Sequence, residues 1–239
     1  MSLKPGTAGH GVTRNWLVKA WIGNETHGLV FLTIKVEEFM KKIHAKLIGK
    51  RPILFCAFRI ETITALTRSK TGSAGNDPEE WKRTVLEKNG VLYIPGSYWS
   101  SCLKEGAKYT KAGRGSIQKM FRSCAIVLDE VSYLDRKLPD QWEKMSWEQF
   151  PKNNDAPVYL DIRGVLNPNS KAKNVRYRVA CSPGWKTEFS FAFDDNIISL
   201  PQAKKVLEDS GKLAGVGDGR VLGYGRFDIE DMQISDYKD

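Results

Sequence analysis

The sequence predicts a mixed α+β fold, and three observations support that prediction. The chain has 239 residues, a length that suits one domain carrying insertions. Hydrophobic residues make up 41% of it and charged residues 27%, a globular composition that argues against wholesale disorder. Candidate strands and helices alternate without the regular spacing of βαβ units, which favours an α+β domain over a doubly wound parallel sheet.

The N-terminal part of the chain predicts two strands followed by a helix. Residues 1–15 are rich in glycine and polar groups and predict a flexible lead-in to a single domain over residues 16–235. Short apolar runs at residues 16–22 and 28–33 are typical of strands. Apolar residues then recur at three- and four-residue spacing, which predicts an amphipathic helix over residues 36–48: Val36, Phe39, Met40, Ile43 and Leu47.

The next segment predicts a strand, a polar loop and a helix. Residues 53–66 combine an apolar run with alternation, a pattern typical of a strand. A polar loop at residues 67–76 leads to a helix start, where Asp77 suits the N-cap. Pro78 suits the first helical position and Glu80 the reciprocal capping position. This helix is expected to end before the Asn-Gly turn that follows.

A second strand-turn-helix unit begins at residues 91–94. This apolar run leads into Pro95 and Gly96, after which Ser97 suits the N-cap of a helix over residues 98–110. A helix start of this kind presents free N–H groups and hydroxyls where a phosphate can sit. The same spacing also suits an ordinary capped helix with a partly buried Trp99.

The middle of the chain predicts an insertion and a β-hairpin. Residues 129–157 mix acidic residues with tryptophans and are expected to form an irregular insertion or surface flap. Apolar segments at residues 158–165 and 175–180 flank an Asn-Pro-Asn-Ser turn, which predicts a hairpin over residues 158–180. The outward positions of this hairpin are expected to include Arg163, Arg176 and Arg178.

The C-terminal third predicts a strand, a helix and a glycine-rich segment. Phe189, Phe191 and Phe193 alternate with smaller or polar residues, which places one aromatic face on the core. Residues 199–210 predict a helix, and residues 226–229 a terminal strand. The window between them holds five glycines, which let backbone N–H groups face outward toward an anionic backbone, although the glycines also suit a mobile loop. Neither the Rossmann spacing nor GxxxxGK[ST] occurs.

Charge and cysteine usage narrow the expected partners and location. Lysine and arginine number 37 against 28 acidic residues, and the formal net charge of +9 suits a polyanionic partner. Four cysteines without a CxxC pair argue against a zinc knuckle and favour a reducing cytoplasm. No apolar run reaches the about 18 residues of a membrane span. We therefore expect a cytoplasmic protein without membrane contact, cofactor or metal, and we leave residues 236–239, which match the start of an acidic epitope tag, outside the fold prediction.

Three segments together resemble the repeat-associated mysterious protein (RAMP) superfamily. Residues 93–108, YIPGSYWSSCLKEGAK, resemble its Ile-Pro-Gly-Ser-Ser-Leu-Lys-Gly signature. Residues 215–229, GVGDGRVLGYGRFDI, resemble its C-terminal glycine-rich loop and closing strand, and residues 58–72, FRIETITALTRSKTG, are similar to its first ferredoxin-like strand and loop. The three matches cover a small part of the chain, and they occur in the same order as in the family. They look most like the backbone subunits that polymerise along CRISPR RNA, or a stand-alone phage or bacterial relative.

The resemblance implies a modified ferredoxin-like, RNA-recognition-motif-like antiparallel sheet with helices on one face and an inserted β-hairpin. Tyr98 and Trp99 depart from the pattern, which prefers a small residue and Leu there. Nuclease-active relatives carry an Asp after the first strand, but the nearest carboxylate here is Asp77, whose sequence context favours a helix cap. His44 is a candidate general base, although a solvated or half-buried histidine is favoured. No convincing active site follows.

We therefore predict a non-catalytic binder of single-stranded RNA or DNA that assembles along the strand or with other subunits of a ribonucleoprotein. The glycine-rich segment and the cap of the middle helix are expected to converge around a sugar-phosphate chain. Two alternatives stay open: a metal-independent RNA endonuclease using His44 or Tyr224, and a protein-binding scaffold using the tryptophan-rich residues 140–150. Tyr177 is a further candidate platform for stacked bases. The expected nucleic-acid contacts form a basic track with aromatic platforms: Arg68, Lys70, Ser97, Tyr98, Trp99, Lys104, Lys108, Lys111, Arg114, Arg163, Arg176, Arg178, Gly217, Gly219, Arg220, Tyr224 and Arg226.

Overall fold

The computed structural model describes residues 15–20, 30–35, 40–57, 77–166, 171 and 173–237. Strands β1 (Asn15–Ala20) and β2 (Val30–Lys35), of which only the backbone is described, pair antiparallel with each other and with no other described strand. The sequence predicted both strands. The predicted loop with Arg68 and Lys70 lies outside the described residues.

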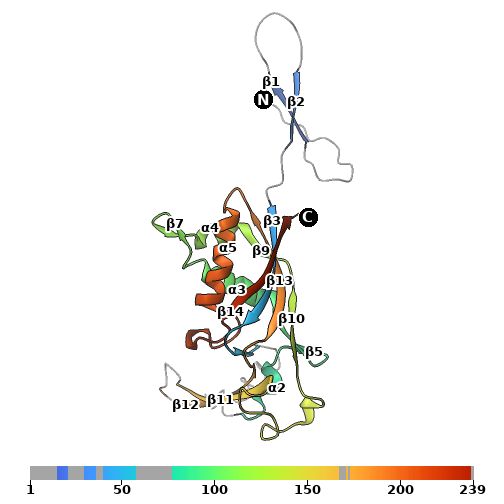
Figure 1. The fold of residues 1–239 in the computed structure, drawn as a ribbon, viewed down its shortest axis with the longest axis vertical. Helices are drawn as coiled ribbons and strands as arrows, with labels where there is room; N and C mark the ends of the chain where they lie inside the picture. The colour runs from blue at the N-terminus through green and yellow to red at the C-terminus, as the bar shows by residue number, and fades with distance from the viewer. Residues whose placement is uncertain are drawn as a thin grey trace, which may run out of the picture.

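A four-stranded antiparallel sheet in the order β14–β3–β13–β9 forms the centre of the molecule (Figure 1). Its strands are β3 (Met40–Gly49), β9 (Ala125–Val127), β13 (Lys186–Asp194) and β14 (Phe227–Asp236). Along the chain, the succession is β3, helix, β9, β13, helix, β14, and β13 lies antiparallel between β3 and β9. This βαββαβ arrangement is a mixed α+β architecture and is consistent with a ferredoxin-like fold.

The prediction of a helix over residues 36–48 is wrong, because the part of this segment that the structure describes forms strand β3. Ile43, Ala45 and Leu47 are fully buried, whereas Lys46 between them is exposed, so the segment alternates with the period of a strand. Ile43 and Leu47 fit both the strand and the helix period, which makes the sequence pattern ambiguous. Pairing with β13 on one side and β14 on the other decides in favour of the strand.

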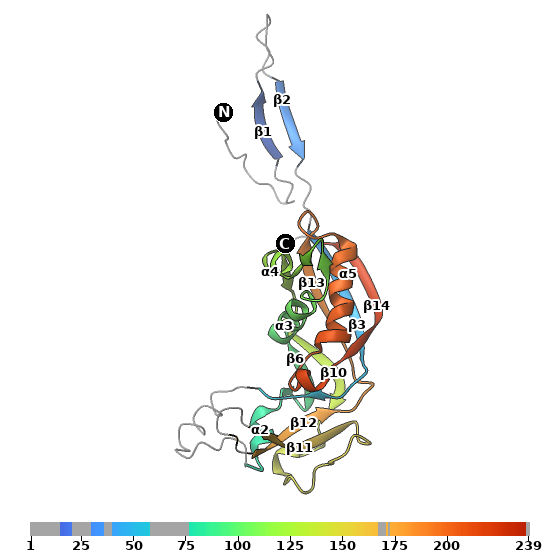
Figure 2. The same cartoon turned by 90° about the vertical axis from the view of Figure 1, so that its left-hand side faces the viewer.

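Three helices lie on one face of this sheet (Figures 1 and 2). They are α3 (Gly96–Gly106), α4 (Gln118–Cys124) and α5 (Leu200–Asp209). Phe189, Phe191 and Phe193 are buried, which confirms the predicted aromatic face of β13. Helix α5, also confirmed, begins with a capping box between Ser199 and Gln202. It continues into a π-turn, η2 (Ser210–Ala214), where a side chain on Gly211 would overlap the carbonyl oxygen of Phe227.

The predicted β-hairpin is confirmed and belongs to a second, three-stranded sheet. Strands β11 (Val158–Leu166) and β12 (Lys173–Cys181) pair along their length, and β12 also pairs with β4 (Ile53–Leu54). Helix α2 (Glu80–Thr84) contacts β12 and is shorter than predicted, since β5 (Glu87–Lys88) follows it. Figure 1 shows α2, β11 and β12 together at the end of the molecule opposite β1 and β2.

The segment predicted as an irregular insertion, residues 129–157, is partly regular. It contains β10 (Val131–Lys137), which pairs with β6 (Val91–Pro95), and a 3₁₀ turn, η1 (Trp142–Lys144). Trp142 packs against Trp81 with ring centroids 5.9 Å apart, and Trp147 meets Tyr177 edge-on at 5.7 Å. Both tryptophans are half-buried and pack against the core of the domain.

The C-terminal strand is longer than predicted. β14 extends to Asp236, whose carboxylate lies 2.5 Å from the ammonium of Lys41 on β3. The amide of Tyr237 donates to the carbonyl of Met40 at 3.0 Å. Residues 236 and 237 therefore continue the sheet pairing, although the sequence prediction left them outside the fold. No helix in the described ranges is long and apolar enough to cross a membrane.

Candidate nucleic-acid interface

Segments from the middle and the end of the chain line one open pocket of about 200 Å³. The sequence prediction expected these two segments to converge, and the pocket brings them together. Helix α3 contributes two side chains, the loop after α5 contributes three residues, and one residue follows β4. The lining residues are Cys56, Tyr98, Ser101, Gly217, Asp218 and Arg220.

The glycine-rich loop, residues 215–225, is held against β4 by close backbone contacts. Asp218 donates its amide to the carbonyl of Leu54 at 2.9 Å, and Gly225 donates to Pro52 at 2.7 Å. Gly217 has a φ of +86°, and a Cβ there would lie 2.8 Å from the carbonyl oxygen of Leu54. Most amides of this loop thus donate inside the protein, and the prediction that they face outward toward an anion is wrong for those amides.

Helix α3 presents hydroxyl groups to the pocket. The Tyr98 hydroxyl donates to the carbonyl of Cys56 at 3.4 Å. Burial, followed by the charges of Cys56, Asp218 and Tyr93, raises the pKa of the Tyr98 phenol. Ser101 donates to the carbonyl of Ser97 at 2.9 Å. The prediction that Ser97 caps α3 is wrong, because the helix already begins at Gly96 with Pro95 in the capping position.

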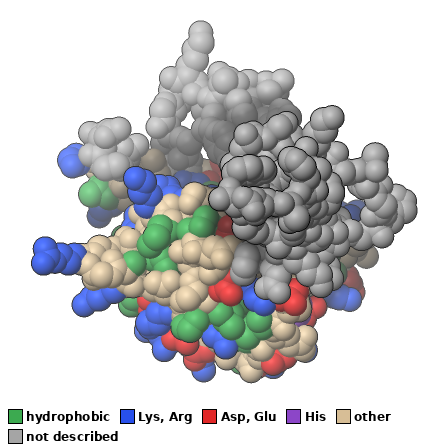
Figure 3. All heavy atoms as spheres, turned by 90° about the horizontal axis from the view of Figure 1, so that it is seen from above, with side chains coloured by type: hydrophobic (Ala, Val, Ile, Leu, Met, Phe, Trp, Pro, Cys, Tyr) green, Lys and Arg blue, Asp and Glu red, His purple; other side chains and the backbone are tan. Residues whose placement is uncertain are grey.

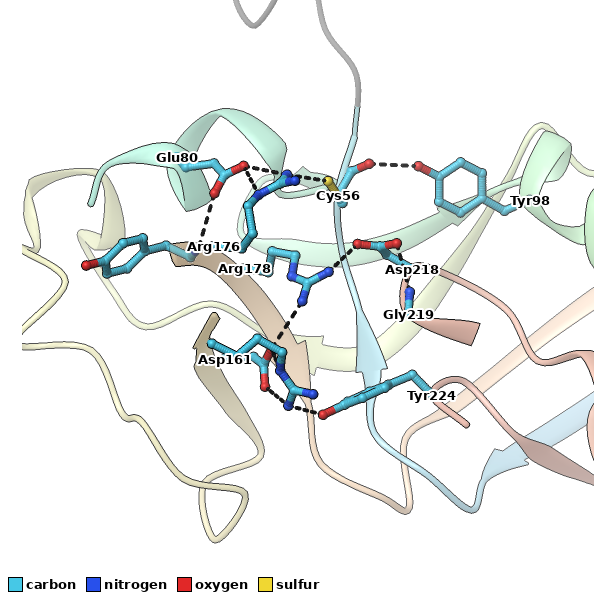
Figure 4. A network of polar contacts seen from close by, with 11 residues as sticks. Cys56, Glu80, Tyr98, Asp161, Arg176, Arg178, Asp218, Gly219 and Tyr224 are labelled. Atoms are coloured by element: carbon cyan, nitrogen blue, oxygen red, sulfur yellow. Dashed lines mark hydrogen bonds and ion pairs between the residues drawn. The ribbon is translucent and has the colours of Figure 1, made fainter. Parts of the chain in front are cut away.

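The three hairpin arginines, Arg163, Arg176 and Arg178, lie in a network of ion pairs. Figure 4 shows Arg176 and Arg178 with their partners Glu80, Asp161 and Asp218. The Nε of Arg176 lies 2.7 Å from Oε1 of Glu80. The Arg178 guanidinium lies 2.5 Å from Asp218 and 3.6 Å from Asp161. Arg163 donates its Nε–H to Asp161 at 2.7 Å.

This network corrects two sequence predictions. Arg163, Arg176 and Arg178 face three carboxylates, so their charges are balanced within the protein, and Arg178 is buried and does not point outward. Glu80 does not act as a capping residue, because its carboxylate accepts from Arg176 and from the amide of Tyr177. The network ties α2, the hairpin and the glycine-rich loop to one another.

The predicted aromatic platforms are mostly engaged elsewhere. Trp99 is fully buried and stacks on Phe189, which excludes it from stacking on a base. Tyr177 packs edge-on against Trp147. The ring of Tyr224 lies 4.9 Å below the Arg163 guanidinium, and its hydroxyl accepts a hydrogen bond from Arg163. Of the four predicted platforms, Tyr98 is the one that lines the pocket.

The remaining predicted cations form three pairs, each in a different place. Arg220 lines the pocket, and Arg226 is half-buried just after the glycine-rich loop. Lys111 and Arg114 are exposed on the small hairpin of β7 (Lys111–Ala112) and β8 (Gly115–Ser116). Figure 3 shows Lys and Arg side chains projecting at the left margin, on the side where Figure 1 places β7. Lys104 on α3 is half-buried. Lys108, just after α3, is paired with Glu105 at 2.7 Å.

The two candidate catalytic residues do not lie in the pocket lining. His44 is on β3, where its Nδ1 lies 3.1 Å from the Ser190 hydroxyl and its Nε2 lies 3.5 Å from Glu188. Asp77 accepts from the amide of Glu79 at 2.9 Å and from Arg83. Burial opposes ionisation of Asp77, but these hydrogen bonds prevail and lower its pKa. The prediction that Asp77 is the N-cap of this helix is wrong, because α2 begins at Glu80 with Glu79 in the capping position.

The face of the central sheet away from the helices offers no stacking surface on its two middle strands. The side chains of that face come from alternate residues of the two strands: Met40, Lys42, His44, Lys46 and Ile48 on β3, and Lys186, Glu188, Ser190, Ala192 and Asp194 on β13. Single-stranded RNA binds to the open sheet of RNA-recognition motifs by stacking on aromatic rings. These positions carry none, so this face does not suit that mode of binding. The described residues also include no group of three or more His, Cys, Asp or Glu side chains that could hold a metal ion.

Sequence reasoning missed several residues of the pocket and of its network. Cys56 lies in an apolar run that predicted only a strand, and Ser101 and Asp218 lie within quoted motifs but carry no local signal that separates them from their neighbours. Asp161 is one polar position in the alternating pattern of a predicted strand, and in the structure its carboxylate pairs with two arginines. The pairing of β12 with β11 and β4, and the contact of Asp218 with Leu54, bring Asp161, Asp218 and Cys56 to one region of the fold.

Comparison with known proteins finds similarity at the level of structure. No family model matches the sequence, and no curated protein matches it. The chain is similar in structure to a chain in the cryo-EM structure of the type III-B Cmr-β bound to cognate target RNA, with 13% sequence identity and a TM-score of 0.45. The similarity covers 82% of this chain and 61% of that chain, so the protein spans about three fifths of the length of that neighbour.

Proposed function

We propose that the protein binds single-stranded RNA or DNA without cleaving it. The sugar-phosphate backbone passes through the pocket between α3 and the glycine-rich loop. Copies of the protein assemble side by side along the strand, as the sequence resemblance to RAMP backbone subunits implies. One observation carries the proposal: the two segments with the most specific sequence signatures, residues 93–108 and 215–229, line the same pocket.

The chemistry of the pocket lining supports an anionic ligand. Arg220 is the cation among the six lining residues and can contact phosphate oxygens. The hydroxyls of Tyr98 and Ser101, which donate to backbone carbonyls, lie beside it in the pocket lining. Asp218 is the one carboxylate of the lining, and its ion pair with Arg178 neutralises it. The formal net charge of +9 adds a long-range attraction for a polyanion.

Binding without cleavage fits the pocket because the one carboxylate of its lining, Asp218, is held in an ion pair with Arg178. The six lining residues include no histidine. The hydroxyl of Tyr224 is bound to Arg163, and His44 lies on the central sheet with Ser190 and Glu188. Incubation with single-stranded and hairpin RNA in a chelator tests this point, and cyclic-phosphate products would contradict it.

Fluorescence anisotropy with a labelled oligonucleotide tests the binding itself. We expect affinity at low salt that falls as salt rises from roughly 50 to 200 mM, because each phosphate contact releases counterions. Arg220→Gln should weaken binding about tenfold and lower the log–log salt slope by about 0.7. Lys144→Gln, which removes the same charge from η1 outside the pocket lining, serves as the control. Equal effects of the two variants would overturn the placement of the strand, and no binding at low salt would overturn the function.

A further inference from the structure

Two apolar side chains at the rim of the pocket are far more exposed than the fold requires. Val221 is 100% exposed and Leu222 is 67% exposed, and we call this pair the apolar tip. The tip belongs to a 3₁₀ turn, η3 (Arg220–Leu222), so it directly follows the arginine that lines the pocket. Exposed apolar side chains add nothing to the stability of the folded chain, and neighbouring ones often mark a binding site.

The backbone holds the apolar tip in place. Gly219 and Gly223, on either side of η3, have φ values of +69° and +87°, a left-handed conformation that favours glycine. Leu222 donates to the carbonyl of Gly219 at 2.8 Å, and Gly223 donates to Arg220 at 2.9 Å. Tyr224, next along the chain, is bound to Arg163 of the hairpin. The tip is therefore presented outward by a turn that is fixed at its base.

We infer that the apolar tip is a wedge, with Leu222 inserting between two neighbouring bases of a single-stranded nucleic acid whose phosphate lies at Arg220. This inference rests on the proposed function. Each nucleotide joins an anionic phosphate to a base with apolar faces, so a strand that places a phosphate at Arg220 brings its bases near the residues that follow. Leucine side chains are known to enter base steps and unstack them.

The position of the tip favours a nucleic acid over a protein partner. A protein surface that covers the tip would also have to cover Arg220 and the pocket mouth, where the proposed strand runs. A nucleic acid satisfies Arg220 and the apolar tip with one ligand. Contact with a second copy of the chain is the competing outcome, and the experiment below separates the two.

The test uses a single-stranded oligonucleotide with 2-aminopurine at one position, whose fluorescence rises when its stacking is broken. Wild-type protein should raise the fluorescence about threefold on saturation at one or more positions of the probe. The double variant Val221→Ser, Leu222→Ser should lose most of this rise and bind about tenfold more weakly, because the contact that buries a leucine is lost. Leu213→Ser, which alters a leucine that is 45% exposed outside the pocket lining, should behave as wild type.

Arg220→Gln separates failure of the inference from failure of the proposed function. If Arg220→Gln binds as wild type, the strand does not pass through the pocket, and both proposals fall. If Arg220→Gln weakens binding but the double variant keeps the full fluorescence rise, the wedge alone is overturned. A double variant that keeps the fluorescence rise and sediments as a smaller species without oligonucleotide would show that the tip contacts a second copy, which also overturns the wedge.

Discussion

The indole of Trp99 lies parallel to the ring of Phe189, with 4.3 Å between the centroids and 2° between the planes. Its edge also meets Phe227 of β14 at 5.7 Å. Trp99 therefore joins α3 to the central sheet. The preceding residue, Tyr98, lines the pocket. The bulky residue at this helix entrance is a packing residue that fixes the position of α3, and the pocket depends on it indirectly.

Replacing Trp99 by alanine should destabilise the fold without acting on the ligand directly. We expect a loss of about 3–5 kcal/mol in the free energy of unfolding, because a fully buried indole is removed from the core. Urea denaturation followed by circular dichroism measures this loss. Tyr98→Phe, which keeps the ring and removes only a 3.4 Å hydrogen bond, should cost about 1 kcal/mol. A stable Trp99→Ala protein with weakened binding would instead make Trp99 a ligand contact.

Two glycines of the loop provide a matched pair for testing close backbone approach. Gly225 and Gly223 both have positive φ, at +67° and +87°. A Cβ on Gly225 would overlap the carbonyl of Val216, whereas a Cβ on Gly223 would meet nothing within 4 Å. Gly225→Ala should therefore cost about 3 kcal/mol or more, and Gly223→Ala about 1–2 kcal/mol from the backbone conformation alone. Equal losses in urea denaturation would contradict the close packing of this loop.

Asp218→Asn should move stability and affinity in opposite directions. The substitution leaves the buried Arg178 with Asp161 at 3.6 Å as its remaining carboxylate, which should lower the free energy of unfolding by about 1–3 kcal/mol. It also leaves the charge of Arg178 without the Asp218 carboxylate, which raises the net charge beside the pocket by one and should tighten oligonucleotide binding several-fold at low salt. Denaturation and anisotropy on the same preparation measure both effects. Weaker binding by a folded Asp218→Asn variant would mean that the carboxylate itself contacts the ligand.

Cys56 offers a chemical footprint of the pocket. Burial, and then the charge of Asp218, raises the pKa of this thiol, so at pH 8 less of it is thiolate than in a free cysteine. Its alkylation by iodoacetamide should be slow at pH 8 and accelerate as pH rises toward the raised pKa. A bound oligonucleotide should slow the reaction of Cys56 and leave Cys124, which is partly exposed outside the pocket lining, unchanged. Mass spectrometry of the alkylated peptides measures both rates.

If saturating oligonucleotide protects neither Cys56 nor Cys124 from alkylation, the ligand binds elsewhere on the surface. Cys102 and Cys181 are internal controls for the folded state, because both thiols are buried. Burial raises the pKa of Cys102 to about 12, so its modification at pH 8 would report unfolding and not access through the pocket.

Local patterns were sufficient for several elements. The alternating phenylalanines of β13, the strands β11 and β12 of the hairpin and the helix α5 each follow from patterns among neighbouring residues, so each could be predicted from the chain alone. The convergence of α3 and the glycine-rich loop was also expected, but only from the resemblance of both segments to one superfamily.

Long-range pairing explains where the predictions were wrong. The residues of β3 suit a helix or a strand by spacing, and the two neighbouring strands decide between them. Hairpin arginines that look solvated in the sequence are paired, and one partner, Glu80, is separated from Arg176 by 96 positions. No window of the sequence contains both members of such a pair.

The sequence by itself determined the α+β class, the order of most elements and the basic, glycine-rich character of the segments that line the pocket. Periodicity, turn chemistry and composition are properties of short stretches and of the whole chain, and both are readable without coordinates. The tertiary structure decided which charges remain available and which rings are buried. Burial and ion pairing depend on neighbours in space, and those neighbours are set by the packing of α2, the hairpin and the loop against β4.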